Sequence, residues 1–189
     1  GAGQEIYTVT STDTADISAG VIYSLAGVDA AAFTIDAETG VVTLTANPNY
    51  EVKSSYAFTV VATDVAGNAS SKAVTLTIAN LDEVAPTITS GGSAGSINEN
   101  TGAGQVIYTV TSTDSADISA GVVYSLTGAD AALFSINAAT GEVSLKDDAD
   151  YETQTSYHFT VVATDVAGNP SEQDVVLLVN NLDEVAPTI

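Results

Sequence analysis

The sequence repeats itself at a fixed offset of 101 residues, which pairs Gly1 with Gly102 and Ile88 with Ile189. The 88 paired positions need no gap, and 60 of them are identical. Solenoid repeats have shorter periods, of about 20–50 residues, so a repeat of this length is a whole domain. Each copy has about 100 residues, which is enough for its own hydrophobic core. The sequence therefore predicts two tandem domains from a longer array.

The repeat also predicts the domain boundaries. We assign residues 1–83 to the first repeat, 84–184 to the second, and 185–189 to the start of the next linker. The stretch Thr89–Thr101 of the second copy has no counterpart before Gly1. The first repeat is therefore expected to be truncated at its N-terminus.

Charge narrows the classes of partner. Asp and Glu total 24 against three lysines, which gives a formal net charge of −21. Nucleic acids and anionic membranes need basic residues to offset their phosphates, so this charge argues against both and favours metal cations. The chain has no cysteine for disulfides or thiolate metal sites, and it has no apolar run of about 18 residues that could insert into a membrane. The same charge opposes self-association, so we expect a monomer.

Hydrophobic residues recur with a period of two, which indicates β-strands. In the second copy the inward positions are expected to be Val106, Tyr108 and Val110, then Tyr157, Phe159, Val161 and Ala163, then Val175, Leu177 and Val179. Phe134–Ile136 and Glu142–Leu145 flank a loop that ends at Gly141 and indicate a hairpin. At most one helical turn is expected, at Asp130–Leu133. The fold class predicted is all-β: two seven-stranded antiparallel Greek-key β-sandwiches, end to end.

Acidic residues gather where these strands end and in the linkers. In the second copy they are Glu99, Asp114, Asp117, Asp150, Glu152, Asp165, Asp183 and Glu184. Such a placement would let carboxylates meet across a domain boundary, and calcium takes six to eight oxygen ligands of this kind. A simpler alternative is that acidic residues gather in loops because loops are solvated. The spacing alone leaves both interpretations open.

The order of these motifs resembles a cadherin repeat. The matching segments are Asn98–Asn100, Thr113–Asp117, Phe134–Leu145, Asp150–Glu152, Val162–Asp165 and Asn181–Pro187. The similarity covers essentially the whole second copy and the first copy from Gly1 onward. The Ala-, Thr- and Asp-rich style, without cysteine or arginine, is more similar to the repeats of large bacterial surface adhesins of the RTX type than to animal cadherins.

The resemblance implies Ca²⁺ at the junction between repeats. Carried onto this chain, the junction ligands are Glu51, Asp82, Glu83, Asp114, Asp117 and Asp165, with the carbonyls of Leu81 and Val84. The matching upstream set of the second repeat is Glu99, Asp150 and Glu152, with Asp183 and Glu184 in its linker. The sequence departs from the family at Asn49, which replaces the aspartate found at Asp150, and at Ala116, which stands where the family has the second aspartate of its Asp-x-Asp motif.

Two functions of different classes follow from this resemblance. The first is a calcium-stiffened extender of an extracellular bacterial surface adhesin, whose repeats contact their neighbours in the chain. The alternative is a binding module whose sandwich face contacts polysaccharide or a like domain. We do not expect an enzyme, because His158 is the one histidine and occupies an outward strand position.

Overall fold

Strands with alternating inward and outward side chains form both halves of the chain. The computed structural model describes residues 1–14, 20–115, 118 and 121–189. It divides into unit 1, Gly1–Leu81, and unit 2, Asp82–Ile189. Among the described residues the helical structure is a 3₁₀ turn in each unit, η1 at Ala30–Ala32 and η2 at Ala131–Leu133, and no helix could span a membrane. The all-β prediction is confirmed.

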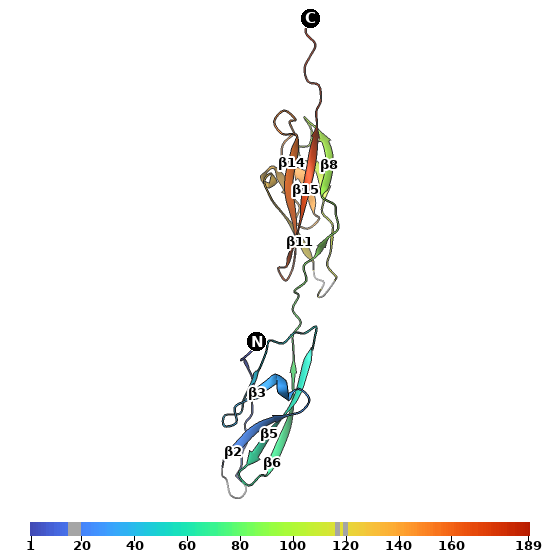
Figure 1. Ribbon diagram of the computed structural model, residues 1–189. Helices are drawn as coiled ribbons and strands as arrows, with labels where there is room; N and C mark the ends of the chain where they lie inside the picture. Colours follow the sequence, from blue (N-terminus) through green and yellow to red (C-terminus); the bar gives the residue numbers. More distant parts are fainter. Residues whose placement is uncertain (15–19, 116–117, 119–120) are drawn as a thin grey trace. The chain divides into compact units, whose positions relative to one another are not determined.

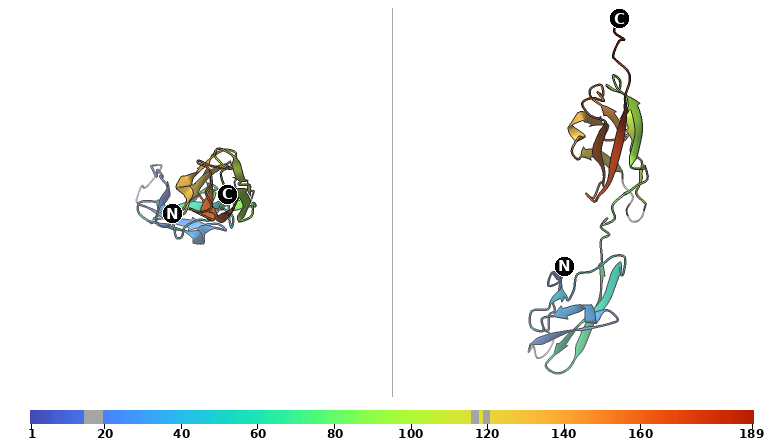
Figure 2. Two further views of the ribbon diagram at one scale, coloured as in Figure 1. Left: turned by 90° about the horizontal axis from the view of Figure 1, so that it is seen from above. Right: turned by 45° about the horizontal axis from the view of Figure 1, so that its top comes forward.

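Unit 2 contains a four-stranded sheet in the order β11-β14-β15-β8, whose strands lie side by side in Figure 1. Their bounds are β11 Val122–Thr127, β14 Ser156–Asp165, β15 Pro170–Asn180 and β8 Ser93–Asn98. The pairs are antiparallel except for β15 with β8, which is parallel and is visible in the right view of Figure 2.

A second sheet of unit 2 has the order β12-β13-β9, and a short pair joins β10 with β7. Their bounds are β12 Phe134–Ile136, β13 Glu142–Leu145, β9 Val106–Thr109, β10 Ser112–Thr113 and β7 Thr87–Ile88. The pairing of β12 with β13 confirms the predicted hairpin.

The core of unit 2 is built from inward residues of both sheets. The β14 residues Tyr157, Phe159, Val161 and Ala163 are at most 7% exposed, and Val175, Leu177 and Val179 of β15 are at most 5% exposed. Phe134 of the opposite sheet packs its ring against Phe159 at a centroid distance of 4.6 Å. The period of two therefore identified the inward faces of both long strands.

Unit 1 repeats this plan with fewer strands. One sheet has the order β2-β5-β6, and its bounds are β2 Val21–Ala26, β5 Ser55–Asp64 and β6 Ala69–Thr77. The other has the order β1-β4-β3, and its bounds are β1 Glu5–Thr8, β4 Val41–Leu44 and β3 Phe33–Ile35. In unit 1, β6 lies at the edge of its sheet, where unit 2 has β8 beside β15. Val74 and Leu76 of β6 are accordingly half-buried, whereas their equivalents Val175 and Leu177 are buried.

One inward position was predicted wrongly. Tyr108 and Val110 are buried as expected, but Val106 is 54% exposed. The register between β13 and β9 shifts between Val143 and Ser144, so an irregularity interrupts the alternation. Ile107 packs against the core in place of Val106.

The strand count also differs from the expected seven. The described residues form six strands in unit 1 and nine in unit 2, where β7 and β10 are two residues long. The parallel pair of β8 with β15 is a further difference, because an entirely antiparallel sandwich was expected.

Gly141 ends the hairpin loop in a conformation that favours glycine. Its φ is +72°, and its N–H donates to the carbonyl of Asn137 at 2.9 Å. A Cβ added there would lie 2.6 Å from the carbonyl oxygen of Val110 and 3.3 Å from the ring of Tyr124. The loop backbone is therefore pressed against Val110, the residue after β9, and against β11, with no room for a side chain.

We predict that Gly141→Ala destabilises unit 2 by about 3 kcal/mol or more, because backbone strain and a steric clash add. Gly104→Ala is the matched control, since Gly104 has the same φ of +72° with no atom within 4 Å of an added Cβ. This control should cost about 1–2 kcal/mol, from the backbone conformation alone. Hydrogen exchange of amides in the core strands of unit 2, such as that of the fully buried Val143, measures both losses. Equal losses would show that the contact with Val110 is not the cause.

Candidate metal centre

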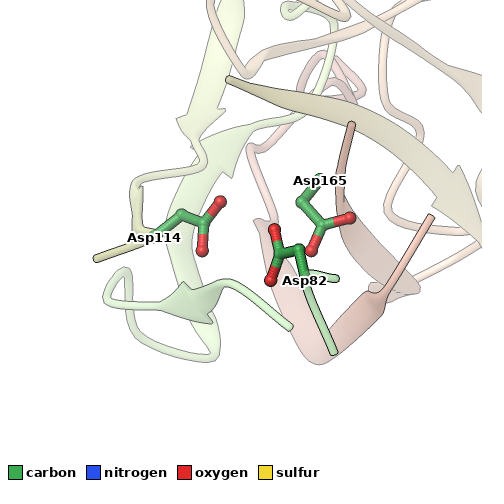
Figure 3. A group of neighbouring side chains, drawn as sticks. All are labelled: Asp82, Asp114 and Asp165. Atoms are coloured by element: carbon green, nitrogen blue, oxygen red, sulfur yellow. The ribbon is translucent and has the colours of Figure 1, made fainter. Parts of the chain in front are cut away.

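Three aspartates meet at one end of unit 2. Asp165 is the last residue of β14, Asp114 follows β10, and Asp82 begins the unit. A carboxylate oxygen of each lies within 4.8 Å of one from each of the others. Figure 3 shows their carboxylates turned toward a common space. We call these three residues the entry cluster, because it forms where the chain enters unit 2.

The turn after β14 holds Asp165 in place. Its Oδ1 accepts the N–H groups of Gly168 at 2.7 Å and Asn169 at 2.8 Å, and its Oδ2 accepts Nδ2 of Asn169 at 2.8 Å. Burial raises the pKa of Asp165, but these hydrogen bonds, led by that of the Asn169 side chain, lower it by more. The net pKa lies below the ordinary value, so Asp165 is an ionised carboxylate at neutral pH.

Asp114 places a carboxylate oxygen in a buried position. Its Oδ2 is buried and has no hydrogen-bond partner among the described residues. A buried polar atom without a partner carries a desolvation cost, which a bound cation would remove. Within the described part of the chain, the one ion pair within 4.0 Å joins Lys53 to Asp29 in unit 1. The entry cluster offers carboxylate oxygens as ligand atoms, the type that hard divalent cations prefer.

A second acidic group, the exit cluster, consists of Glu99, Asp150 and Glu152. Its carboxylate oxygens also lie within 4.8 Å of one another. Glu99 follows β8 and is 1% exposed, whereas Asp150 and Glu152 lie exposed in the turn before β14. Because β14 has ten residues at about 3.3 Å each, the two clusters lie at opposite ends of unit 2, roughly 30 Å apart.

Glu99 ties the exit cluster to the last segment of the chain. Its Oε2 accepts the N–H of Tyr151 at 3.0 Å, and its Oε1 accepts the N–H of Leu182. Asn181 donates its Nδ2 to Oε1 of Glu152 at 3.2 Å, and Asn100 donates to Glu184. The C-terminal segment of unit 2 is therefore tied to the exit cluster by hydrogen bonds of side chains.

The two glutamates of the exit cluster have opposite pKa shifts. The N–H of Leu182 is the main cause that lowers the pKa of Glu99, and the N–H of Tyr151 adds to it against the effect of burial. A backbone hydrogen bond of its own lowers the pKa of Glu152, but burial, the Glu99 carboxylate and the charge of Glu184 together raise it by more. The net pKa of Glu152 lies above the ordinary value because burial and the nearby negative charges both disfavour its ionised form.

Unit 1 contains Asp13 and Asp64, the equivalents of two members of the entry cluster, Asp114 and Asp165. Asp64 is held by Asn68, whose N–H and Nδ2 donate to its carboxylate at 2.8 Å each. Oδ2 of Asp13 is buried with no partner in the described residues, like that of Asp114. A cavity of about 210 Å³ lined by Asp13, Asp64 and Asn68 lies at this end of unit 1.

Asn49 keeps one role of the aspartate that it replaces. Its Oδ1 accepts the N–H of Val52 at 2.8 Å, as Oδ1 of Asp150 accepts that of Thr153 at 2.9 Å in unit 2. Either side chain can close this turn, because both have an oxygen at the same place. Asn49 therefore preserves the turn and removes a negative charge.

The structure brings together six of the predicted ligands, three in each cluster of unit 2. The others are exposed, and they lie in unit 1 or in the terminal segments of unit 2: Asn49, Glu51, Leu81, Glu83, Val84, Asp183 and Glu184. Asp117 lies outside the described residues.

The sequence analysis missed the asparagines that serve these clusters. Asn169, Asn181 and Asn100 each donate a side-chain amide to an acidic residue of a cluster or its linker. Repetition gave a weak signal for Asn169, because Asn68 occupies the same place after Asp64. An amide beside a carboxylate is common in turns, so the pattern alone did not indicate a role.

Comparison with protein families gives one match, to the family described as Cadherin domain, over residues 2–79 and 93–181. Mouse Protocadherin Fat 4 is 31% identical over 192 residues, which cover 97% of this chain and 4% of that protein. The Drosophila melanogaster Protocadherin-like wing polarity protein stan is 32% identical over 91% of this chain and 5% of its own length. The chain thus spans about one-twentieth of these curated relatives.

Among solved structures, the crystal structure of human Protocadherin-24 EC1-2 matches with a TM-score of 0.68. The match covers 96% of this chain and 90% of that chain at 21% identity. The crystal structure of Drosophila N-cadherin EC1-4 matches with a TM-score of 0.65 at 21% identity over 95% of this chain and 45% of that chain. At this level of identity the likeness shows the fold.

We predict that Glu99→Gln lowers the titration midpoint of Glu152 in the metal-free chain, because the Glu99 carboxylate helps to raise that pKa. A raised folded-state pKa means that the proton on Glu152 stabilises the folded unit at acid pH, and this contribution is lost as the pH rises through that pKa. Carboxyl ¹³C NMR titration in chelator measures the midpoint. Glu38→Gln, in an exposed turn of unit 1, is the control and should leave it in place. An unmoved midpoint in Glu99→Gln would contradict the charge coupling.

Proposed function

Because this chain belongs to the cadherin domain family, we propose that it binds Ca²⁺ at the junction between its repeats and that the bound ion fixes their relative orientation. Cadherin domains as a family bind Ca²⁺ at such junctions. The observation that carries the proposal is the entry cluster, where the partnerless Oδ2 of Asp114 is buried beside the carboxylates of Asp82 and Asp165. The residues present fit a hard cation, since each ligand atom of the cluster is a carboxylate oxygen.

The ligands proposed for this junction combine the entry cluster with residues of the linker and the upstream repeat. They are Asp82, Asp114, Asp165, Glu83, Asp117 and Glu51, with the carbonyls of Leu81 and Val84. The exit cluster, with Asp183 and Glu184, would serve the next junction in the same way. We take the repeats as residues 1–83 and 84–184, followed at 185–189 by the start of the next linker or repeat.

Electrostatics supply the mechanism. Two carboxylates about 5 Å apart repel by roughly 3 kcal/mol at an effective dielectric of 20, so a metal-free junction is pushed apart by its own ligands. When Ca²⁺ binds, the same carboxylates become shared ligands and hold the two repeats together. Mg²⁺ suits this arrangement less well, because it prefers a tight octahedral shell with retained waters.

Stiffening of this kind fits a structural role rather than catalysis, and cadherin domains are adhesion modules. We propose that the repeats extend a surface adhesin in the calcium-rich medium outside a bacterial cell. The absence of cysteine and arginine and the richness in alanine, threonine and aspartate support the bacterial assignment. The whole protein would contact polysaccharide or another cell-surface protein through other parts of its chain, while the repeats stay monomeric.

A binding module remains the second candidate, on the strength of one feature of unit 2. Leu178 of β15 is 52% exposed and Val176 is half-buried on the outer face of the sheet, where unit 1 has Thr77 and Thr75. This face would contact a like domain or a polysaccharide. Its lack of an exposed aromatic row weakens the polysaccharide version, because sugar rings stack on aromatic side chains.

We predict that the chain binds Ca²⁺ and that Asp114→Ala with Asp165→Ala removes the tight binding while both units stay folded. Asp13→Ala with Asp64→Ala is the matched control, because the repeat offset places no residue equivalent to Asp82 beside that pair within this chain. Isothermal calorimetry with Ca²⁺ and with Mg²⁺ measures the affinities, and circular dichroism checks the fold. Equal losses in the two double variants would rule out a junction centred on the entry cluster.

The extender role predicts a calcium-dependent change in dimensions. Small-angle X-ray scattering in millimolar Ca²⁺ should give a narrower distance distribution and a longer maximum dimension than in chelator, with no change in mass at tens of micromolar. The charge of −21 should keep the chain monomeric. The Asp114→Ala, Asp165→Ala variant serves as the control and should give the chelator profile in both media. Calcium-driven dimers would favour the binding module instead.

A further inference from the structure

Asn169 connects the end of β14 to the segment that enters unit 2. Its Nδ2 donates to the carbonyl oxygen of Asp82 at 2.9 Å and to Oδ2 of Asp165 at 2.8 Å. A side-chain amide carries two N–H protons, so these two bonds use the full donor capacity of Nδ2. One side chain therefore contacts two members of the entry cluster, which lie 83 positions apart in the sequence.

Two hydrogen bonds that involve the backbone of Asn169 hold this residue against Asp165. Its N–H donates to Oδ1 of Asp165 at 2.8 Å, and its carbonyl accepts the N–H of Asp165 at 3.2 Å. The side chain is partly buried, unlike that of its equivalent Asn68. The end of β14 thus holds Asn169 in position, and its side-chain amide extends from there to the linker.

The repeat provides a comparison within the same chain. Asn68 donates its N–H and its Nδ2 to Asp64 at 2.8 Å each, the same bonds that Asn169 makes to Asp165. Holding the aspartate is therefore common to both units. What unit 2 adds is the bond from Nδ2 to the Asp82 carbonyl.

We infer that Asn169 is a positioning residue that holds the Asp82 backbone in place, so that the Asp82 carboxylate joins the entry cluster before any cation binds. The effect of this positioning on calcium affinity rests on the proposed function. A bond to the carbonyl of Asp82 restrains the same residue whose side chain faces Asp114 and Asp165. Restraint of this kind raises affinity because less of the linker must be ordered when the ligand binds.

A purely structural role for Asn169 would give a different result. If its bonds served only the turn, the loss of the amide would lower the stability of unit 2 and leave the linker and the cation affinity as they are. The test therefore needs a measurement of the linker itself and one of binding, besides stability.

The experiment compares Asn169→Ala with Asn68→Ala in the full chain. In chelator, ¹⁵N relaxation of the Glu83 and Val84 amides should show lower order in Asn169→Ala than in the parent, and parent-like order in Asn68→Ala. In calorimetry, Asn169→Ala should bind Ca²⁺ about three- to tenfold more weakly, as the loss of one ordinary hydrogen bond would give. Asn68→Ala should bind with the affinity of the parent.

The outcomes separate this inference from the calcium proposal. If the parent binds no Ca²⁺, the proposed function fails, and the relaxation in chelator still tests the linker restraint. Parent-like linker order in Asn169→Ala overturns the inference, and so does reduced order with unchanged calcium affinity. If Asn169→Ala does not fold, Asn169→Leu keeps about the same side-chain size without N–H donors and without an added charge, and its linker order in chelator gives the same test.

Discussion

The antiparallel ladder of β14 with β15 is the interaction on which the rest of unit 2 depends. Nine residue pairs, from Ser156 with Leu178 to Thr164 with Pro170, fix the register of the two longest strands. That register directs the inward residues of both strands into the core. It also fixes where β14 starts and ends, and the two acidic clusters lie at those ends. A slip of one residue in this register would turn every side chain of the strand to the opposite face. The same register therefore buries the core residues and places the carboxylates.

Much of this arrangement could be predicted because it depends on local periodicity. Alternation in β14 and the loop ending at Gly141 identified the core strand and the hairpin. The acidic residues stood out at the strand ends, but their division into two sets came from the resemblance to cadherin repeats and not from their spacing. The exposed Val106 could not be predicted, because a register shift depends on the partner strand β13. The bond from Asn169 to Asp82 could not be predicted either, because it joins segments brought together only by the fold.

Comparison of the two copies distinguishes the residues that the fold needs from the acidic residues of the clusters. Phe33 and Phe134 make the same ring contacts with the central strand in both units, at centroid distances of 4.4 and 4.6 Å. The turn that begins at Asn49 or Asp150 forms with either residue. Charge at that turn is thus free to vary without loss of structure, and the acidic residue in the second copy is a property of its exit cluster. The ring contacts of the core are the same in both copies, whereas an acidic side chain at the end of a strand can be replaced without loss of the turn.

The parallel pairing of β8 with β15 has a mechanical consequence. The chain enters this pair at Ser93, beside Val176, and leaves it at Asn180, beside Asn98. Tension on the two ends of unit 2 would therefore pull the strands past each other along their length. In that geometry the hydrogen bonds of the pair are strained in parallel and must break together, whereas a hairpin pulled from its open end breaks one bond at a time. The sheet thereby resists stretching at the point where force enters and leaves the unit.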